Sequence, residues 1–199
     1  MPTTDRHRGA ALYYATRDGQ SRRIAEHIFG RLAESETLSP PKDLALTPPA
    51  AADLAAASVI VLVAAVRYGK HLPEADRFLA AYRSLASPPP PLALASVNLT
   101  ARKPAKTTAT GNAYLRKLIA RHRLAPALAV AFAGRLDYRR YGWLDRQIIR
   151  FIMLLTRGPT DPDTNVEYTS WPAVDEFAAR IAALQSGAIL RPMTHTSKR

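Results

Sequence analysis

The chain contains no cysteine among its 199 residues, which excludes a disulfide framework, a thiolate metal site and a cysteine nucleophile. Long apolar runs are also missing. The longest clean one, residues 59–66, is far below the roughly 20 residues that a membrane-spanning helix needs. The first residues, MPTTDRHRG, contain no apolar stretch of the signal-peptide type. These absences favour a soluble or peripheral protein of a reducing compartment.

Acidic residues are scarce, at 16 against 28 Lys and Arg, and the formal net charge is +12. The imbalance is concentrated in residues 98–157, where 13 basic residues oppose two acidic ones for a net charge of +11. Such a basic block indicates an anionic partner: a nucleic acid, an anionic membrane surface, or a small molecule bearing carboxylates or phosphates. No nucleic-acid motif is recognisable, so no nucleic-acid partner is expected. The histidine spacing suits no metal ion, and none is expected.

Short apolar runs alternate with longer amphipathic ones along the chain. Strands are predicted at residues 10–15, 59–66, 92–97 and 127–133, with short ones near Thr37 and at 167–169. Helices are predicted at residues 21–32, 50–57, 73–86, 112–122, 143–155 and 171–184. This alternation predicts an α/β domain of three layers, in which helices cover a doubly wound, five-stranded parallel sheet.

Ligands of such folds bind at the carboxyl ends of the strands, which directs attention to the loops there. The loop Thr16–Ser21 (TRDGQS) leaves a buried strand and opens a helix. One interpretation is that its backbone wraps a phosphate against the N-terminus of the helix. The other is that Asp18 and Gly19 form a tight turn and Ser21 caps the helix. The loop is not a Walker motif, because the Gly-Lys-Ser/Thr ending is missing.

The string TRDGQ at residues 16–20 resembles the phosphate loop of flavodoxin-like proteins, in the version found in bacterial quinone-dependent protoporphyrinogen IX dehydrogenases. Three further segments resemble the same family: VRYG at 66–69, SVNLTARKP at 96–104, and AGRLDYRRY at 133–141 with Trp143, Asp145, Arg146 and Ile149. The resemblance covers residues 12–184 approximately. It implies a flavodoxin-like domain at 10–185. Residues 137–157 approximately are predicted to be a basic helical insertion in it, because a simple five-stranded domain needs only a short turn there. Residues 1–9 are predicted to be an N-terminal extension, and residues 186–199 a disordered basic tail.

The resemblance implies an enzyme that oxidises protoporphyrinogen IX to protoporphyrin IX in haem biosynthesis. FMN would be the cofactor, and a membrane quinone, menaquinone or ubiquinone, would accept the electrons. No catalytic acid or base is assigned, because the cofactor supplies the redox chemistry. The implied location is cytoplasmic, peripheral to the cytoplasmic face of the bacterial inner membrane. The alternatives are a flavodoxin-like NAD(P)H-quinone reductase and an FMN electron carrier.

The implied cofactor-binding residues lie in four loops. The phosphate would be held by Thr16, Arg17, Asp18, Gly19, Gln20 and Ser21, and the ring would be bordered by Arg67, Tyr68, Gly69, Asn98, Leu99, Thr100, Gly134, Arg135, Leu136 and Tyr138. The candidates for the substrate carboxylates are Arg102, Lys103, Arg139 and Arg140. Asp18 is expected to point into the turn, because a carboxylate repels a phosphate. His71 is expected to be a surface residue.

The basic insertion at about 137–157 admits three interpretations. Its helix packs on the domain with solvated charges, lies on an anionic membrane with its apolar side down, or forms a wall of the substrate site. The last two are compatible with each other, and the family resemblance favours them.

Overall fold

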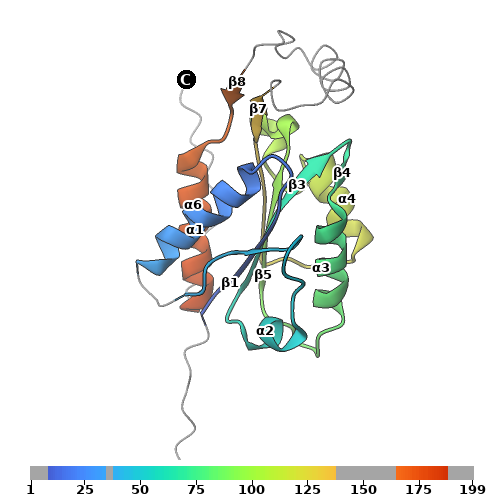
Figure 1. Ribbon diagram of the computed structural model, residues 1–199, viewed down its shortest axis with the longest axis vertical. Helices are drawn as coiled ribbons and strands as arrows, with labels where there is room; N and C mark the ends of the chain where they lie inside the picture. The colour runs from blue at the N-terminus through green and yellow to red at the C-terminus, as the bar shows by residue number, and fades with distance from the viewer. Residues whose placement is uncertain (1–8, 35–37, 138–164, 188–199) are drawn as a thin grey trace, which may run out of the picture.

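The computed structural model describes residues 9–34, 38–137 and 165–187, and its centre is a sheet of five parallel strands (Figure 1). The strand order is β2-β1-β3-β5-β6. These strands are β1 (Ala11–Ala15), β2 (Lys42–Asp43), β3 (Ile60–Arg67), β5 (Leu92–Val97) and β6 (Leu128–Phe132). The short β4 (Lys70–His71) pairs antiparallel with the end of β3. The predicted doubly wound, five-stranded parallel sheet is confirmed.

Helices cover both faces of this sheet and complete the three layers (Figure 1). One face packs against α1 (Gln20–Ala33) and α6 (Trp171–Gln185). The other face packs against α2 (Ala51–Ala56), α3 (Pro73–Arg83) and α4 (Ala113–Arg121). The loop between β5 and α4 contains two 3₁₀ turns, η1 (Leu99–Arg102) and η2 (Pro104–Lys106). Within the described ranges, no helix is both long and apolar enough to cross a bilayer.

The apolar core lies on both sides of the sheet, and the central strand β3 is apolar at every position from Ile60 to Val66. Leu62 and Val63, consecutive on β3, are both 0% exposed and belong to the two opposite core layers. A strand whose side chains alternate between two buried faces has to be apolar throughout, as buried parallel strands are. The predicted strand at 59–66 is therefore confirmed, and the strand predicted at 92–97 has those bounds.

Two short strands differ from the sequence prediction. β2 lies at Lys42–Asp43 inside the proline-rich segment, where it pairs with Tyr13 and Tyr14, whereas the prediction placed it near Thr37, outside the described residues. The strand predicted at 167–169 instead ends at Glu167: β8 (Asn165–Glu167) pairs antiparallel with β7 (Arg135–Asp137). In both cases, pairing with a distant segment decides the register. The helix predicted at 143–155, most of the insertion, and most of the predicted terminal segments lie outside the described residues.

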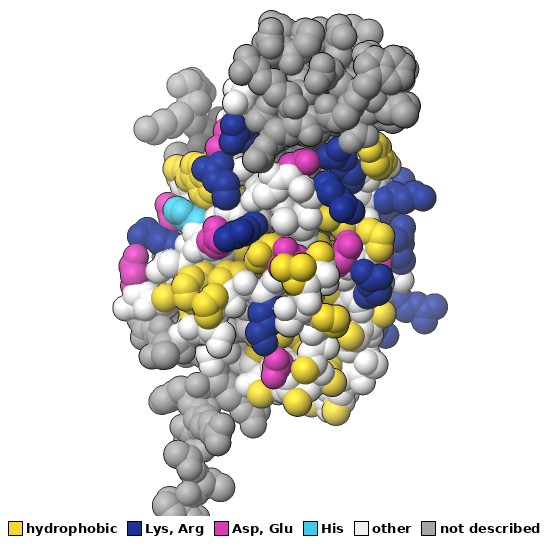
Figure 2. Space-filling view, in the orientation of Figure 1, with side chains coloured by type: hydrophobic (Ala, Val, Ile, Leu, Met, Phe, Trp, Pro, Cys, Tyr) yellow, Lys and Arg dark blue, Asp and Glu magenta, His cyan; other side chains and the backbone are white. Residues whose placement is uncertain are grey.

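Charge is distributed unevenly over the surface. Lys and Arg side chains stand out on the side of the molecule where α4 lies (Figures 1 and 2). On α1, by contrast, basic and acidic side chains form ion pairs such as Arg22–Glu26, at 2.7 Å.

Candidate functional site

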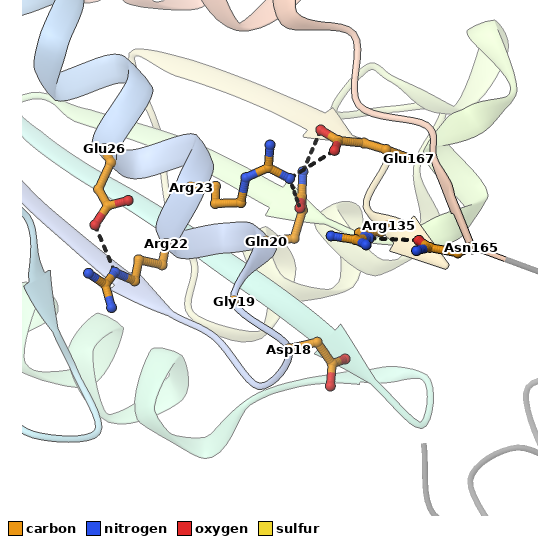
Figure 3. A pocket seen from close by; sticks show the side chains of 9 residues that line it. All are labelled: Asp18, Gly19, Gln20, Arg22, Arg23, Glu26, Arg135, Asn165 and Glu167. Atoms are coloured by element: carbon orange, nitrogen blue, oxygen red, sulfur yellow. Dashed lines mark hydrogen bonds and ion pairs between the residues drawn. The ribbon is translucent and has the colours of Figure 1, made fainter. Parts of the chain in front are cut away.

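The loops that leave the carboxyl ends of β1, β3, β5 and β6 meet at one edge of the sheet, as the doubly wound topology requires (Figure 1). On the α1 side of this edge lies a polar cavity of about 690 Å³ between the first turns of α1 and the β7–β8 ribbon (Figure 3). The residues that line it are Asp18, Gly19, Gln20, Arg22, Arg23, Glu26, Arg135, Asn165 and Glu167. Two of the four predicted ligand loops therefore contribute to one cavity.

The loop between β1 and α1 presents an open helix N-terminus. Gly19 has a φ of 88°, a left-handed conformation that glycine adopts without strain, and its N–H donates to Thr16 Oγ1 at 3.0 Å. The first turn of α1 contains no acidic residue, and no side chain of the described residues caps it. The first N–H groups of a helix have no acceptor within the helix, and they carry the positive end of its dipole. This end of α1 is therefore suited to an anion.

Ser21 and Gln20 differ in what their side chains do at this helix end. Ser21 is 1% exposed, and its Oγ has no hydrogen-bond partner among the described residues. Gln20 turns away from the loop, because its Nε2 donates to Thr169 Oγ1 at 2.9 Å and to Glu167 Oε1 at 3.0 Å. Gln20 can therefore contribute its backbone N–H to an anion site, but its side chain is committed to the β8 segment.

Asp18 does not point into the turn, so that expectation is wrong. Its Oδ2 accepts from Arg67 Nη1 at 2.7 Å, an ion pair that joins the β1–α1 loop to the end of β3. The guanidinium offsets the carboxylate charge beside the open end of α1. A carboxylate in this loop is compatible with a nearby anion for that reason.

The turn after β3 exposes an aromatic ring at the sheet edge. Arg67 and Lys70 pair across a two-residue hairpin loop formed by Tyr68 and Gly69, with φ values of 51° and 76°. A positive φ is uncommon for a tyrosine. The Tyr68 side chain is 58% exposed, and the Arg67 guanidinium lies 5.4 Å from the centre of its ring. The hairpin thus holds an aromatic face open at the edge where the loops meet.

Beneath this hairpin, a buried polar network connects β4, β5 and the start of α4. His71 Nε2 is hydrogen-bonded to Ser96 Oγ at 2.9 Å, and Asn98 Nδ2 donates to the same oxygen at 3.0 Å. Asn112 Nδ2 donates to Asn98 Oδ1 at 3.0 Å, and Thr100 Oγ1 donates to that oxygen at 2.6 Å. Asn98 is 5% exposed, so it acts here by bracing the two loops rather than by presenting its amide to solvent.

His71 is 8% exposed, so the expectation of a surface histidine is wrong. Burial lowers the pKa of its imidazole from 6.5 to about 4, with smaller influences from Asp76, Arg121 and His122. The neighbouring residues Leu72 and Pro73 do not indicate that the His71 side chain is buried. Its burial follows from the β3–β4 pairing, in which His71 lies opposite Val66.

Acidification is expected to destabilise the protein through His71. The unfolded chain binds a proton at this position at a higher pH than the folded chain, so the free energy of unfolding falls as the pH drops from about 6.5 towards about 4. Between pH 7 and pH 5 this contribution amounts to about 2 kcal/mol. Urea unfolding of the wild type and of His71→Gln at both pH values measures it. Equal losses of stability in the two proteins would contradict the prediction.

The β7–β8 ribbon forms the side of the site that follows β6. Arg135 Nε donates to Asn165 Oδ1 at 2.9 Å, and Arg135 lines the cavity. Leu136 is 0% exposed, so its side chain belongs to the core. Gly134 is buried next to the start of the ribbon. The predicted site residues Tyr138, Arg139 and Arg140 lie outside the described residues.

Glu167 was not among the predicted site residues, yet it connects the ribbon to α1 (Figure 3). Its Oε2 accepts from Arg23 Nη1 at 2.8 Å, and its Oε1 accepts from Gln20. Burial by itself raises the pKa of Glu167, but the hydrogen bonds from Arg23 and Gln20 outweigh it and hold the pKa below its ordinary value. No local pattern marks this residue, because its partners are more than 140 positions away in the sequence.

Comparison with known proteins gives consistent matches to one family. Residues 11–163 match the family model of the flavodoxin domain. The chain is 37% identical over 185 residues to "Protoporphyrinogen IX dehydrogenase (quinone)" of Leishmania major, which covers 93% of this chain and 79% of that protein. It is 34% identical over 184 residues to the protein of the same name from Escherichia coli (strain K12), which covers 90% of this chain and 98% of that one.

Two solved structures share the fold at low sequence identity. Oxidised flavodoxin 1 from Bacillus cereus aligns with a TM-score of 0.50 at 15% identity, over 92% of this chain and 99% of that one. Rubredoxin oxygen:oxidoreductase from Desulfovibrio gigas aligns with a TM-score of 0.54 at 10% identity, over 90% of this chain and 36% of that one. At these identities the similarity establishes the fold alone.

Proposed function

The chain belongs to the flavodoxin-domain family and, within it, to the quinone-dependent protoporphyrinogen IX dehydrogenases; on this premise we propose that it oxidises protoporphyrinogen IX to protoporphyrin IX and transfers the electrons to a quinone. The observation that carries the proposal is the match to the Escherichia coli protein, which extends over 98% of that protein's length. The similarity therefore involves a whole enzyme and not one module of it. The chain is an oxidoreductase of haem biosynthesis.

The flavin is FMN, held with its phosphate at the open N-terminus of α1. The support is the combination of an uncapped first turn without acidic residues, the left-handed Gly19, and the buried Ser21 Oγ that has no partner among the described residues. The ion pair with Arg67 offsets the one nearby carboxylate of the loop, Asp18. When bound, the flavin supplies the hydride acceptor for the substrate and a donor for the quinone.

The remaining loops border the flavin ring. The Tyr68 ring is exposed enough to stack on it, and Gly69 lets the backbone come close. Leu99 and Thr100 lie half-buried at the next strand end and are available as a second wall. Gly134 and Arg135 form the remaining side, where Arg135 lines the cavity. The protein's part in the reaction is to bind, orient and exclude water around the two reacting molecules.

The substrate carries propionate groups, and basic side chains next to the ring edge suit them. Arg102 and Lys103 lie on the loop between β5 and α4, with Lys103 exposed. Arg139 and Arg140 remain candidates from the sequence. The quinone is menaquinone or ubiquinone, and the enzyme associates peripherally with the anionic membrane that contains it.

An anaerobic assay tests this function. We expect the FMN-reconstituted protein to convert protoporphyrinogen IX to fluorescent porphyrin only when both FMN and a quinone are present, with the flavin spectrum recorded on the same sample. Omission of FMN and omission of quinone are the controls. A yellow protein that leaves the porphyrinogen unoxidised would contradict the proposal. Turnover with NAD(P)H would then indicate a quinone reductase, and a reducible flavin without any turnover would indicate a carrier.

A further inference from the structure

Five exposed cations surround the hairpin and the start of α4. They are Lys70 on β4, Lys103 and Lys106 in the loop after β5, and Arg116 and Lys117 on α4; we call them the basic face. Within residues 9–34, 38–137 and 165–187, none of the five has an ion-pair partner. Their charges are therefore available to an external anionic partner.

Contacts place the hairpin and α4 side by side. Gly69, Lys70, Tyr114 and Lys117 line one small cavity, so Lys70 and Lys117 stand at the same opening. Figure 2 shows Lys and Arg side chains projecting on the side where Figure 1 places α4 and β4. Cations from separate segments of the chain thus converge on one surface.

The opposite layer of the molecule does not share this excess. On α1, Arg23 pairs with Glu167 at 2.8 Å and Arg31 pairs with Asp175 at 2.9 Å. Its cations are balanced by carboxylates, whereas those of the basic face are not. Over the part of the chain that the structure describes, the uncompensated positive charge therefore lies on the side of the hairpin and α4.

The basic face adjoins the candidate site. Lys70 directly follows Gly69, and Lys103 directly follows η1, so two of its members belong to the loops proposed to border the flavin ring. Tyr68, at the tip of the hairpin, is the one aromatic side chain that is exposed among the described residues. Basic residues together with an exposed tyrosine suit the interface of a bilayer, where cations meet headgroup phosphates and the ring lies at headgroup level.

We propose that the basic face docks the protein on an anionic lipid bilayer with the hairpin towards the lipid. The proposal rests on the proposed function, because a lipid-soluble quinone has to reach the flavin site from the membrane. A nucleic acid is the alternative polyanionic partner for the basic face. Single-stranded nucleic acids are bound by several stacking aromatics along a basic groove, and Tyr68 alone does not provide that. The charge pattern and the lipid-soluble acceptor favour the bilayer.

Vesicle sedimentation with the full chain tests the docking. The vesicles contain equal parts of phosphatidylglycerol and phosphatidylcholine, and phosphatidylcholine alone serves as the uncharged comparison. We expect binding to the anionic vesicles only, and a steep decrease with salt. The double variant Lys106→Gln/Lys117→Gln should bind roughly 30-fold more weakly, because each basic residue near an anionic surface contributes about 1 kcal/mol and 1.4 kcal/mol is a factor of ten. The matched control Arg31→Gln/Lys42→Gln removes the same charge elsewhere and should bind like the wild type.

A paired activity measurement separates this proposal from the proposed function. With a short-chain, water-soluble quinone, the double variant and the wild type should oxidise protoporphyrinogen IX at the same rate. With a long-chain quinone embedded in the anionic vesicles, the double variant should be slower. Failure of all proteins to oxidise the substrate, even with the soluble quinone, would contradict the proposed function but leave the vesicle result to decide the docking.

Three results would overturn the docking proposal. The first is equal binding to charged and uncharged vesicles, and the second is unchanged vesicle binding in the double variant. The third is binding to a mixed-sequence RNA oligonucleotide that is tighter than binding to the vesicles and is lost in the double variant, which would assign the basic face to a nucleic acid.

Discussion

Replacement of Arg67 by methionine is expected to weaken FMN binding roughly 100-fold, an order of magnitude set by short-range charge interactions near a protein surface. The reason is the ion pair between Arg67 Nη1 and Asp18 Oδ2, at 2.7 Å. Without the guanidinium, the Asp18 carboxylate repels the phosphate proposed to bind at the start of α1. Titration of the apoprotein with FMN, followed by quenching of the flavin fluorescence, measures the change directly.

The double variant Asp18→Asn/Arg67→Met is the control for this effect. It removes the carboxylate together with the cation, so FMN affinity should return to within a few-fold of the wild type. Double-variant cycles of this kind isolate the pairwise contribution. An equally weak double variant would contradict the explanation, because the loss would then come from a contact of Arg67 with the ligand itself.

Replacement of Asn112 by alanine is expected to lower the free energy of unfolding by about 3 kcal/mol. Asn112 is 0% exposed, and its Oδ1 accepts from the backbone N–H groups of Tyr114 and Leu115 at the start of α4. Its Nδ2 donates to Asn98 Oδ1 at 3.0 Å and to the carbonyl of Lys106 at 2.9 Å. Alanine removes the helix cap, so the N–H groups of Tyr114 and Leu115 lose their side-chain acceptor, and the carbonyl of Lys106 loses the donor that Asn112 supplies. Urea unfolding at pH 7 measures the loss.

Thr110→Ala is the matched control, because Thr110 is exposed in the same loop. Among the described residues, its hydroxyl has one hydrogen bond, at 3.5 Å, with the hydroxyl of Thr108. Its effect should stay within about 0.5 kcal/mol, as is usual at exposed positions. Because the network also braces the loops proposed to border the flavin ring, Asn112→Ala should reduce FMN affinity as well. A variant as stable as the wild type would show that the loop and α4 hold together without this side chain.

The long elements of the fold could be predicted because their sequence patterns are local. The predicted strand at 92–97 has the bounds of β5, since prolines precede it and the polar Asn98 follows it. Helix α3 begins at Pro73 as predicted, because proline suits the first turn of a helix. β2 could not be placed in the same way. It has two residues, and its position depends on pairing with Tyr13 and Tyr14.

In the candidate site, the loops and their residue types could be predicted from the sequence, but the interaction partners of their side chains could not. The loop TRDGQS opens α1 as predicted, with Gly19 in the left-handed conformation. The predicted orientation of the Asp18 side chain was wrong, because its partner Arg67 lies 49 positions away in the sequence. The prediction that His71 is exposed was wrong, because its burial depends on Ser96 and on the β3–β4 hairpin. Side-chain direction at such positions depends on long-range contacts that leave no periodic signal in the sequence.

By itself, the sequence determined the alternation of strands and helices, the edge of the sheet where a ligand is proposed to bind, and the family. Each of these depends on local hydrophobic spacing or on contiguous loop residues. The tertiary structure alone decided which charges are compensated: Asp18 by Arg67 at the site, Arg23 by Glu167 on α1, and none of the five cations of the basic face among the described residues. Charges interact through space rather than along the chain. The distribution of the net charge of +12 over the surface is therefore decided only when the chain has folded.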